Sequence, residues 1–130
     1  MAKRSRRRRR ATVTVADARA IASKLERSYE VVVHGRLKFR VHSLVYVAFS
    51  RDETIMEVAF PKELRAALVA GEPEKFSLPR PSDLRFHWIG VRLDKIDHDE
   101  LRALVVEAWR MCVPKKVAAA YDSMPASQRL

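Results

Sequence analysis

Residues 85–121 read RFHWIGVRLDKIDHDELRALVVEAWRMCVPKKVAAAY, and this stretch decides the fold. In its first part, residues with apolar side chains alternate with other residues at every second position, which is the period of a β-strand. The side predicted to face a core carries Ile89, Val91 and Leu93, and the other side carries Phe86, Trp88 and Arg92. The sequence therefore predicts a strand with one apolar face, followed by a turn at residues 95–97.

The second part of this stretch predicts an amphipathic helix. Asp97 is the expected N-cap, and Glu100 three residues later completes a capping box. An apolar face then recurs at the helical period through Leu101, Leu104, Val105, Ala108 and Cys112. Pro114 is expected to end the helix because it lacks an N–H group. A strand leading into such a helix predicts a two-layer domain of sheet and helix.

Length and composition predict one globular domain. A chain of 130 residues with 48% hydrophobic residues can build a single core. No apolar run approaches the roughly 18 residues of a membrane span, and no export signal is complete, so we expect a cytoplasmic protein without a membrane partner. The single cysteine, Cys112, excludes an internal disulfide.

The positive charge is concentrated at the N-terminus. The formal net charge is +10, and residues 1–10 contain seven cations and no anion, which leaves about +3 for residues 11–130. We expect residues 1–12 to form a disordered basic arm, residues 13–122 the domain and residues 123–130 a frayed tail. Such an arm can bind DNA or RNA through phosphate neutralisation, or it can be a solubilising terminus. The arginines of the arm assigned to nucleic-acid binding are Arg6, Arg7, Arg8, Arg9 and Arg10.

The rest of the chain predicts an α+β domain. A helix is expected over residues 14–29, with Thr14 and Asp17 as its capping pair. Residues 37–41, 44–49 and 54–60 predict an antiparallel meander, and a short helix follows between Pro61 and Gly71. A brief edge strand at residues 76–78 precedes the strand and long helix of residues 85–113, and a short last helix spans residues 115–121.

Several segments together resemble the MmcQ/YjbR-like family of small bacterial proteins. They are ADAR at residues 16–19, LKFRV at 37–41, KELRAALVAGEPEKF at 62–76, the His87-Trp88 pair followed by GVRL, and DELRALVVEAWRMCVPKKVAAAYD at 99–122. The resemblance implies a two-layer fold of helix, three strands, helix, two strands and helix. Its topology is similar to that of secretion chaperones, with helices on one face of an antiparallel sheet.

The same resemblance implies a DNA-binding label, without a base-reading motif that could be carried over to named residues. It does not extend to the arginine arm. The early segment also departs from many relatives, because Glu26-Arg27-Ser28-Tyr29 replaces the usual Leu-Pro-Gly turn.

One face of the predicted sheet is the candidate site. If helices cover one side, the other carries cations between aromatic rings, which can hold a phosphate backbone and stack exposed bases. The candidate residues are Lys38, Arg40, Phe86, Trp88 and Arg92. The alternative interpretation is that this face forms a homodimer or receives a protein partner, since a large exposed apolar area usually marks an interaction surface.

The sequence contains no pattern typical of an enzyme or a cofactor site. His34, His42, His87 and His98 are scattered without a carboxylate cluster, so neither a metal site nor a catalytic site is predicted. Cys112 is expected to be a packed core residue, and three glycines cannot form a phosphate-binding loop. The predicted function is therefore mainly non-specific binding of DNA through basic residues, with a protein-interaction or chaperone-like module as the alternative.

Overall fold

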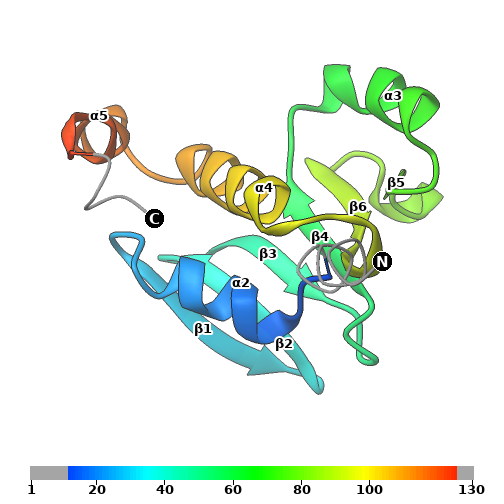
Figure 1. Ribbon diagram of the computed structural model, residues 1–130, viewed down its shortest axis with the longest axis horizontal. Helices are drawn as coiled ribbons and strands as arrows, with labels where there is room; N and C mark the ends of the chain where they lie inside the picture. The colour runs from blue at the N-terminus through cyan, green and yellow to red at the C-terminus, as the bar shows by residue number, and fades with distance from the viewer. Residues whose placement is uncertain (1–11, 126–130) are drawn as a thin grey trace, which may run out of the picture.

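The computed structural model describes residues 12–125, which form a six-stranded antiparallel sheet in the order β1-β2-β3-β4-β6-β5 (Figure 1). The strands are β1 (Ser28–Val33), β2 (Arg36–Val41), β3 (Leu44–Phe49), β4 (Ile55–Ala59), β5 (Phe76–Ser77) and β6 (Trp88–Arg92). The α-helices are α2 (Val15–Ala22), α3 (Lys62–Gly71), α4 (His98–Arg110) and α5 (Lys115–Ser123). Short 3-10 helices cover Pro81–Asp83 and Leu93–Lys95. The predicted α+β class is confirmed.

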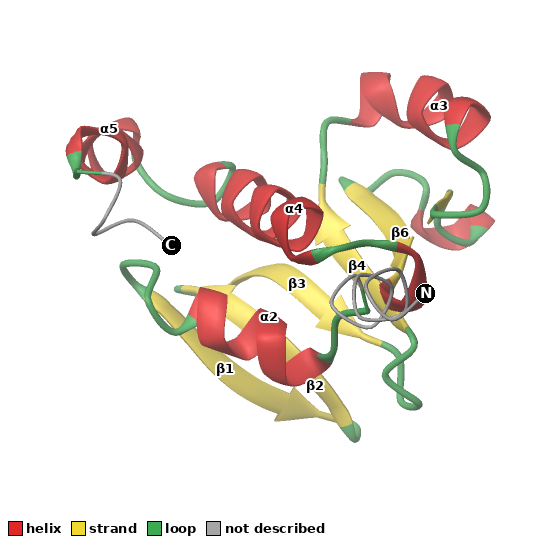
Figure 2. Cartoon of the chain, viewed as in Figure 1, coloured by secondary structure: helices red, strands yellow, loops and turns green. Residues whose placement is uncertain are grey.

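Helices α2 and α4 lie across one face of the sheet (Figure 2). The side chains of β6 that face them are buried, as the alternation predicts: Ile89 and Val91 are 0% exposed. Leu93 is also buried, at 3% exposed, but it lies in the 3-10 helix after the strand. Helix α4 contributes Leu101 and Val105 to the same core, both 0% exposed. Helix α3 lies beside β5 (Figure 1). Within residues 12–125, every helix is too short or too polar to cross a lipid bilayer.

The predicted capping groups form as expected. The Asp97 carboxylate accepts a hydrogen bond from the Glu100 N–H at 2.9 Å, and the Glu100 carboxylate accepts one from the Asp97 N–H at 3.3 Å. Thr14 and Asp17 form the corresponding capping box of α2. At its other end α4 is tied to the early chain, because Trp109 Nε1 donates to the Glu26 carbonyl at 2.9 Å. Pro114 separates α4 from α5, as the sequence indicates.

The first helix is shorter than predicted. A helix over residues 14–29 is wrong: α2 ends at Ala22, and the chain turns and enters β1 at Ser28, so four strands rather than three precede α3. Tyr29 and the three valines of β1 favour extended backbone, and Arg27 turns the chain with a φ of 70°. Leu25 is buried in the turn, 3% exposed, which explains why its spacing suggested a longer apolar stripe.

Candidate nucleic-acid interface

The sheet face opposite α2 and α4 gathers cations from β2. In this strand Leu37, Phe39 and Val41 are buried, while Arg36, Lys38 and Arg40 alternate with them and remain partly exposed. Pairing continues this face across the sheet. Lys38 lies opposite Ala48 of β3, Ala48 opposite Glu57 of β4, and Glu57 opposite Gly90 of β6. We call this surface the open face, and define it by Arg36, Lys38, Arg40, Ala48, Ile55, Glu57, Ala59, Trp88, Gly90 and Arg92.

The cations of the open face differ in how far they are neutralised. Arg36 donates through Nε to the Phe49 carbonyl at 2.9 Å and lies 3.4 Å from the Glu57 carboxylate. Arg92 lies 3.6 Å from the Asp94 carboxylate. In the part of the chain that the structure describes, Lys38 and Arg40 have no carboxylate within ion-pair distance. The positive charge of the open face is therefore concentrated on these two neighbouring residues.

The predicted site residues do not form a single cluster. Lys38 and Arg40 are two residues apart on β2, and Trp88 and Arg92 are both on β6, at opposite ends of the strand. Two strands separate β2 from β6, so the two pairs are roughly 14 Å apart at the usual strand spacing. This distance fits an extended polyanion better than a small ligand. Arg6 to Arg10 lie outside the described residues.

Phe86 does not lie on the strand as predicted. Strand β6 begins at Trp88, and Phe86 lies in the bend before it with 44% of its surface exposed. The cause is Arg65 of α3, whose guanidinium donates to the carbonyls of Leu84, Phe86 and Trp88 at 2.8, 2.9 and 3.0 Å. These bonds hold the backbone of residues 84–88, and pairing with the chain after β4 reaches only as far as His87, whose carbonyl accepts from the Phe60 N–H at 2.9 Å.

Arg65 is the residue that sequence reasoning missed. It is 7% exposed and is the one buried charged side chain within residues 12–125. Its three bonds to carbonyls stabilise a cation that would otherwise be costly to bury. In the sequence it lies on a short helix among alanines and charged residues, where an arginine is ordinarily solvent-exposed. Its bond to the Trp88 carbonyl fixes the backbone at the start of β6.

An apolar pocket adjoins the open face at one end of the sheet. The first residues of β3, the last residue of β4 and the first residue of β6 meet at this end. The pocket has a cavity volume of about 260 Å³, and it is lined by Leu44, Val45, Ala59, Phe86, His87, Trp88, Met111 and Cys112. We call it the Trp88 pocket. Cys112 was expected on the stripe of the long helix, but α4 ends at Arg110 and Cys112 lies just beyond it, half-buried. Burial raises the pKa of the Cys112 thiol, so the thiolate is disfavoured.

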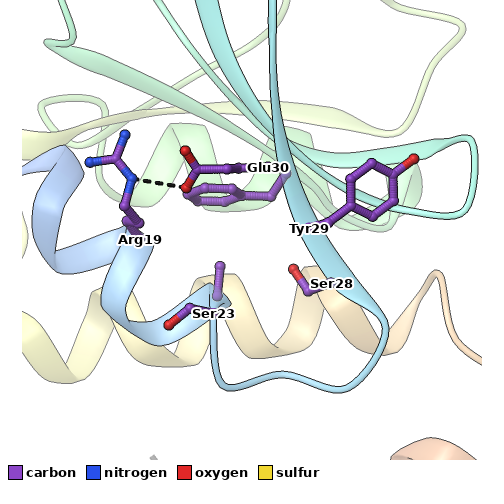
Figure 3. A pocket seen from close by; sticks show the side chains of 7 residues that line it. Arg19, Ser23, Ser28, Tyr29 and Glu30 are labelled. Carbon is purple, nitrogen blue, oxygen red and sulfur yellow. Dashed lines mark hydrogen bonds and ion pairs between the residues drawn. The ribbon is translucent and has the colours of Figure 1, made fainter.

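A second pocket, of about 180 Å³, lies between α2 and β1 (Figure 3). Its polar groups are already paired: Arg19 Nε donates to the Glu30 carboxylate at 2.9 Å, and Ser28 Oγ lies 2.6 Å from the hydroxyl of Tyr46. Burial raises the pKa of Tyr46 to about 12, so this phenol is neutral at physiological pH. The arrangement is typical of structural hydrogen bonding, and none of it forms a nucleophile and base pair.

The histidines occupy unrelated places. His34 and His42 lie in hairpin turns with φ of 53° and 54°, and His98 lies 3.7 Å from the Asp17 carboxylate on the helix side. His87 is exposed and lines the Trp88 pocket. Residues 12–125 contain no group of three or more His, Cys, Asp or Glu side chains placed to hold a metal ion.

Comparison with known proteins identifies the family. The family model named YjbR matches residues 23–111, from just after α2 to just after α4. The chain belongs to the YjbR family. The resemblance found in the sequence is thereby confirmed for this YjbR-family protein, and the match does not include the N-terminal arginines.

One solved structure shows the same fold. It is the crystal structure of protein DR2400 from Deinococcus radiodurans, whose domain is DUF419. The two proteins are 19% identical, the similarity covers 90% of this chain and 91% of that chain, and the TM-score is 0.67. This likeness concerns the fold. The search of curated proteins finds no match to this YjbR-family chain.

Proposed function

We propose that this YjbR-family protein is a non-enzymatic nucleic-acid-binding module of the cytoplasm that contacts phosphates with little sequence preference. The observation that supports the proposal is the pair Lys38 and Arg40, two partly exposed cations on the sheet face opposite α2 and α4, without carboxylate partners among the described residues. Arg36 and Arg92 lie on the same face, each beside a carboxylate that offsets its charge. The seven cations of residues 1–10 add a second cluster of charge.

The proposed contact depends on neutralising phosphates. Each phosphate that pairs with a lysine or arginine releases counterions, and the slope of log affinity against log salt changes by about 0.9 for duplex DNA. Arg40 suits this contact because a guanidinium can bind two oxygens of one phosphate. Its buried Nε has no hydrogen-bond partner within residues 12–125, so an anion bound along that edge would supply one after a small shift of the side chain.

The test is duplex binding as a function of salt. The variant Lys38→Gln with Arg40→Gln should reduce the salt slope by about two units and weaken binding in dilute buffer. A matched control, Lys24→Gln with Lys116→Gln, removes the same charge from exposed positions near α2 and on α5 and should leave the slope within one unit of the wild type. Removal of residues 1–10 should lower the slope further, by up to about six units.

Three outcomes decide the proposal. If the open-face variant and its control behave alike, the open face is not the contact surface. If removal of residues 1–10 leaves the slope unchanged, the arm does not participate. If the full-length protein ignores both DNA and RNA in dilute buffer, nucleic-acid binding is wrong for this protein.

A second candidate function is a protein-interaction module or homodimer. The observation that favours it is the Trp88 pocket, around which Leu44, Phe86 and Met111 are 54, 44 and 43% exposed. A solution mass of twice 15.0 kDa that falls to the monomer value in Leu44→Glu would support this function. A monomer in the wild type would favour the first proposal.

A further inference from the structure

The Trp88 pocket is lined mainly by apolar side chains, which take no part in the proposed contacts with phosphates. Phe86, Trp88 and Leu44 supply aromatic and aliphatic surface, and none of the lining residues is acidic. The cavity of about 260 Å³ is just below the roughly 300–1,000 Å³ typical of sites for drug-sized ligands. Its size and lining therefore suit one flat, mostly apolar group.

Cations stand at the edge of this pocket. The Arg85 guanidinium lies 4.8 Å from the centre of the Phe86 ring, and its backbone carbonyl accepts a hydrogen bond from Lys62 Nζ at 3.0 Å. On the other side Arg40 pairs directly with Val45, a lining residue, across the β2–β3 ladder. An apolar cavity with a cationic rim matches a ligand whose apolar part is joined to anionic groups.

We propose that the Trp88 pocket binds one unpaired base of a single-stranded nucleic acid. Trp88 and Phe86 provide the stacking surface, and Arg40 and Arg85 contact the phosphates on either side of the base. This inference rests on the proposed nucleic-acid binding and names the form of nucleic acid that the site selects. Base stacking on aromatic side chains tolerates any sequence, because every base has a π-face.

A paired base cannot enter the pocket without leaving its stack. In a duplex both faces of a base are covered by neighbouring bases, so the energy of unstacking opposes entry. A single strand presents bases that are already free. The pocket should therefore distinguish single strands from duplexes, while the cations of the open face bind both.

A second copy of the chain fits the pocket less well. In a two-fold symmetric dimer the same patch meets itself, which would bring Arg40 and Arg85 of both copies into one interface. A standard interface also uses about 20–30 residues on each side. The Trp88 pocket is lined by far fewer, with a cationic rim and no acidic residue in its lining to balance it.

Tryptophan fluorescence reports on the pocket directly. The sequence has two tryptophans, and Trp109 is 1% exposed and hydrogen-bonded within the core, which leaves Trp88 as the accessible one. A ten-nucleotide oligothymidylate should quench Trp88 fluorescence in the full-length protein. A ten-base-pair duplex should bind without this quenching.

Cys112 provides an independent reporter, because it lines the pocket and is the single cysteine of the chain. The oligothymidylate should slow its alkylation by an uncharged maleimide several-fold. The duplex should leave the rate unchanged.

Two substitutions test the assignment. Trp88→Ala should weaken oligothymidylate binding roughly 5- to 150-fold, the loss of one stacked base, with a smaller change for the duplex. Leu44→Glu places a carboxylate at the exposed edge of the pocket and should remove the quenching. Its matched control is Val32→Glu, an apolar strand residue that is 68% exposed, against 54% for Leu44, and does not line the pocket. This second pair keeps the test valid if Trp88→Ala fails to fold.

The outcomes separate the two proposals. If single strand and duplex bind equally, with neither quenching nor protection of Cys112, the pocket assignment is overturned while phosphate binding stands. If Leu44→Glu and Val32→Glu have the same effect, the pocket is also not the base site. A dimer that Leu44→Glu dissociates would show that a second copy occupies the pocket. Absence of all nucleic-acid binding would overturn both proposals.

Discussion

The two faces of one sheet differ sharply in this protein, although the same strands form both. On β2, Phe39 and Val41 face α2 and α4 and are at most 1% exposed, whereas Lys38 and Arg40 between them stay accessible. On β6, Ile89 and Val91 are fully buried while Trp88 and Arg92 are not. Alternation along a strand thus lets one face supply stability and leaves the other free to carry charge.

The largest difference in stability between the two faces is expected from substitutions at two adjacent residues of β2. Phe39→Ala should lower the free energy of unfolding by about 3–5 kcal/mol, because it leaves a cavity beside Tyr46 and Phe49. Lys38→Ala, one residue away on the open face, should change it by no more than about 0.5 kcal/mol. Urea unfolding of both variants measures the difference. Equal decreases in the free energy of unfolding would show that Lys38 on the open face is also part of the core.

Arg65 holds the backbone that leads into β6, and its substitution should have the next largest effect on stability. Arg65→Met keeps an unbranched, apolar stem but removes the guanidinium and its three hydrogen bonds to the carbonyls of Leu84, Phe86 and Trp88. The loss of stability should be about 2–4 kcal/mol, since the carbonyls lose a charged donor. Arg65→Lys should restore only part of it, because an ammonium lacks the planar fork. If Arg65→Met unfolds at the wild-type urea concentration, these bonds do not hold the approach to β6.

Tyr46, on the sheet face that α2 and α4 cover, should make the stability of the fold depend on pH in the alkaline range. Burial raises its pKa to about 12 in the folded state, against an ordinary value of 10.0, so the unfolded chain loses the proton first. The contribution of this neutral phenol is fully present below pH 10 and is lost as pH rises towards 12, with a slope of up to about 1.4 kcal/mol per pH unit. Tyr46→Phe should have a shallower decline over this window. Parallel curves for the two proteins would contradict the assignment.

The smallest effect should come from the ion pair on the open face. Arg36 and Glu57 are 3.4 Å apart, with side chains 32 and 29% exposed. A double-mutant cycle with Arg36→Ala and Glu57→Ala should give a coupling of about 0.2–1 kcal/mol, screened by added salt. A coupling above about 2 kcal/mol would place this pair in a buried environment and would weaken the contrast between the faces.

The sequence predicts most of what depends on local spacing. The capping box at Asp97, the apolar face of α4, the break at Pro114 and the alternation of β2 and β6 all rest on residues within a few positions of one another. The end of the first helix could not be predicted in the same way. Leu25 satisfies a helical stripe and is equally well buried from a turn, and only packing distinguishes the two.

The candidate site was predictable in its residue types but not in its assembly. Alternation placed Lys38, Arg40, Trp88 and Arg92 on one face, because strand period alone determines the side on which a residue points. Their separation across the sheet depends on the order β2-β3-β4-β6, which no local pattern contains. The position of Phe86 depends on Arg65, which is about twenty residues away in the chain.

By itself the sequence determined the elements that local chemistry controls: the caps, the helical stripe and the two-faced strands. Tertiary structure alone decided which cations remain without a carboxylate partner and which apolar side chains meet to line the Trp88 pocket. The physical reason is the separation along the chain over which each interaction acts. Backbone hydrogen bonds and side-chain periodicity act over a few residues, whereas ion pairing and the closure of a pocket depend on groups that only the folded chain brings together.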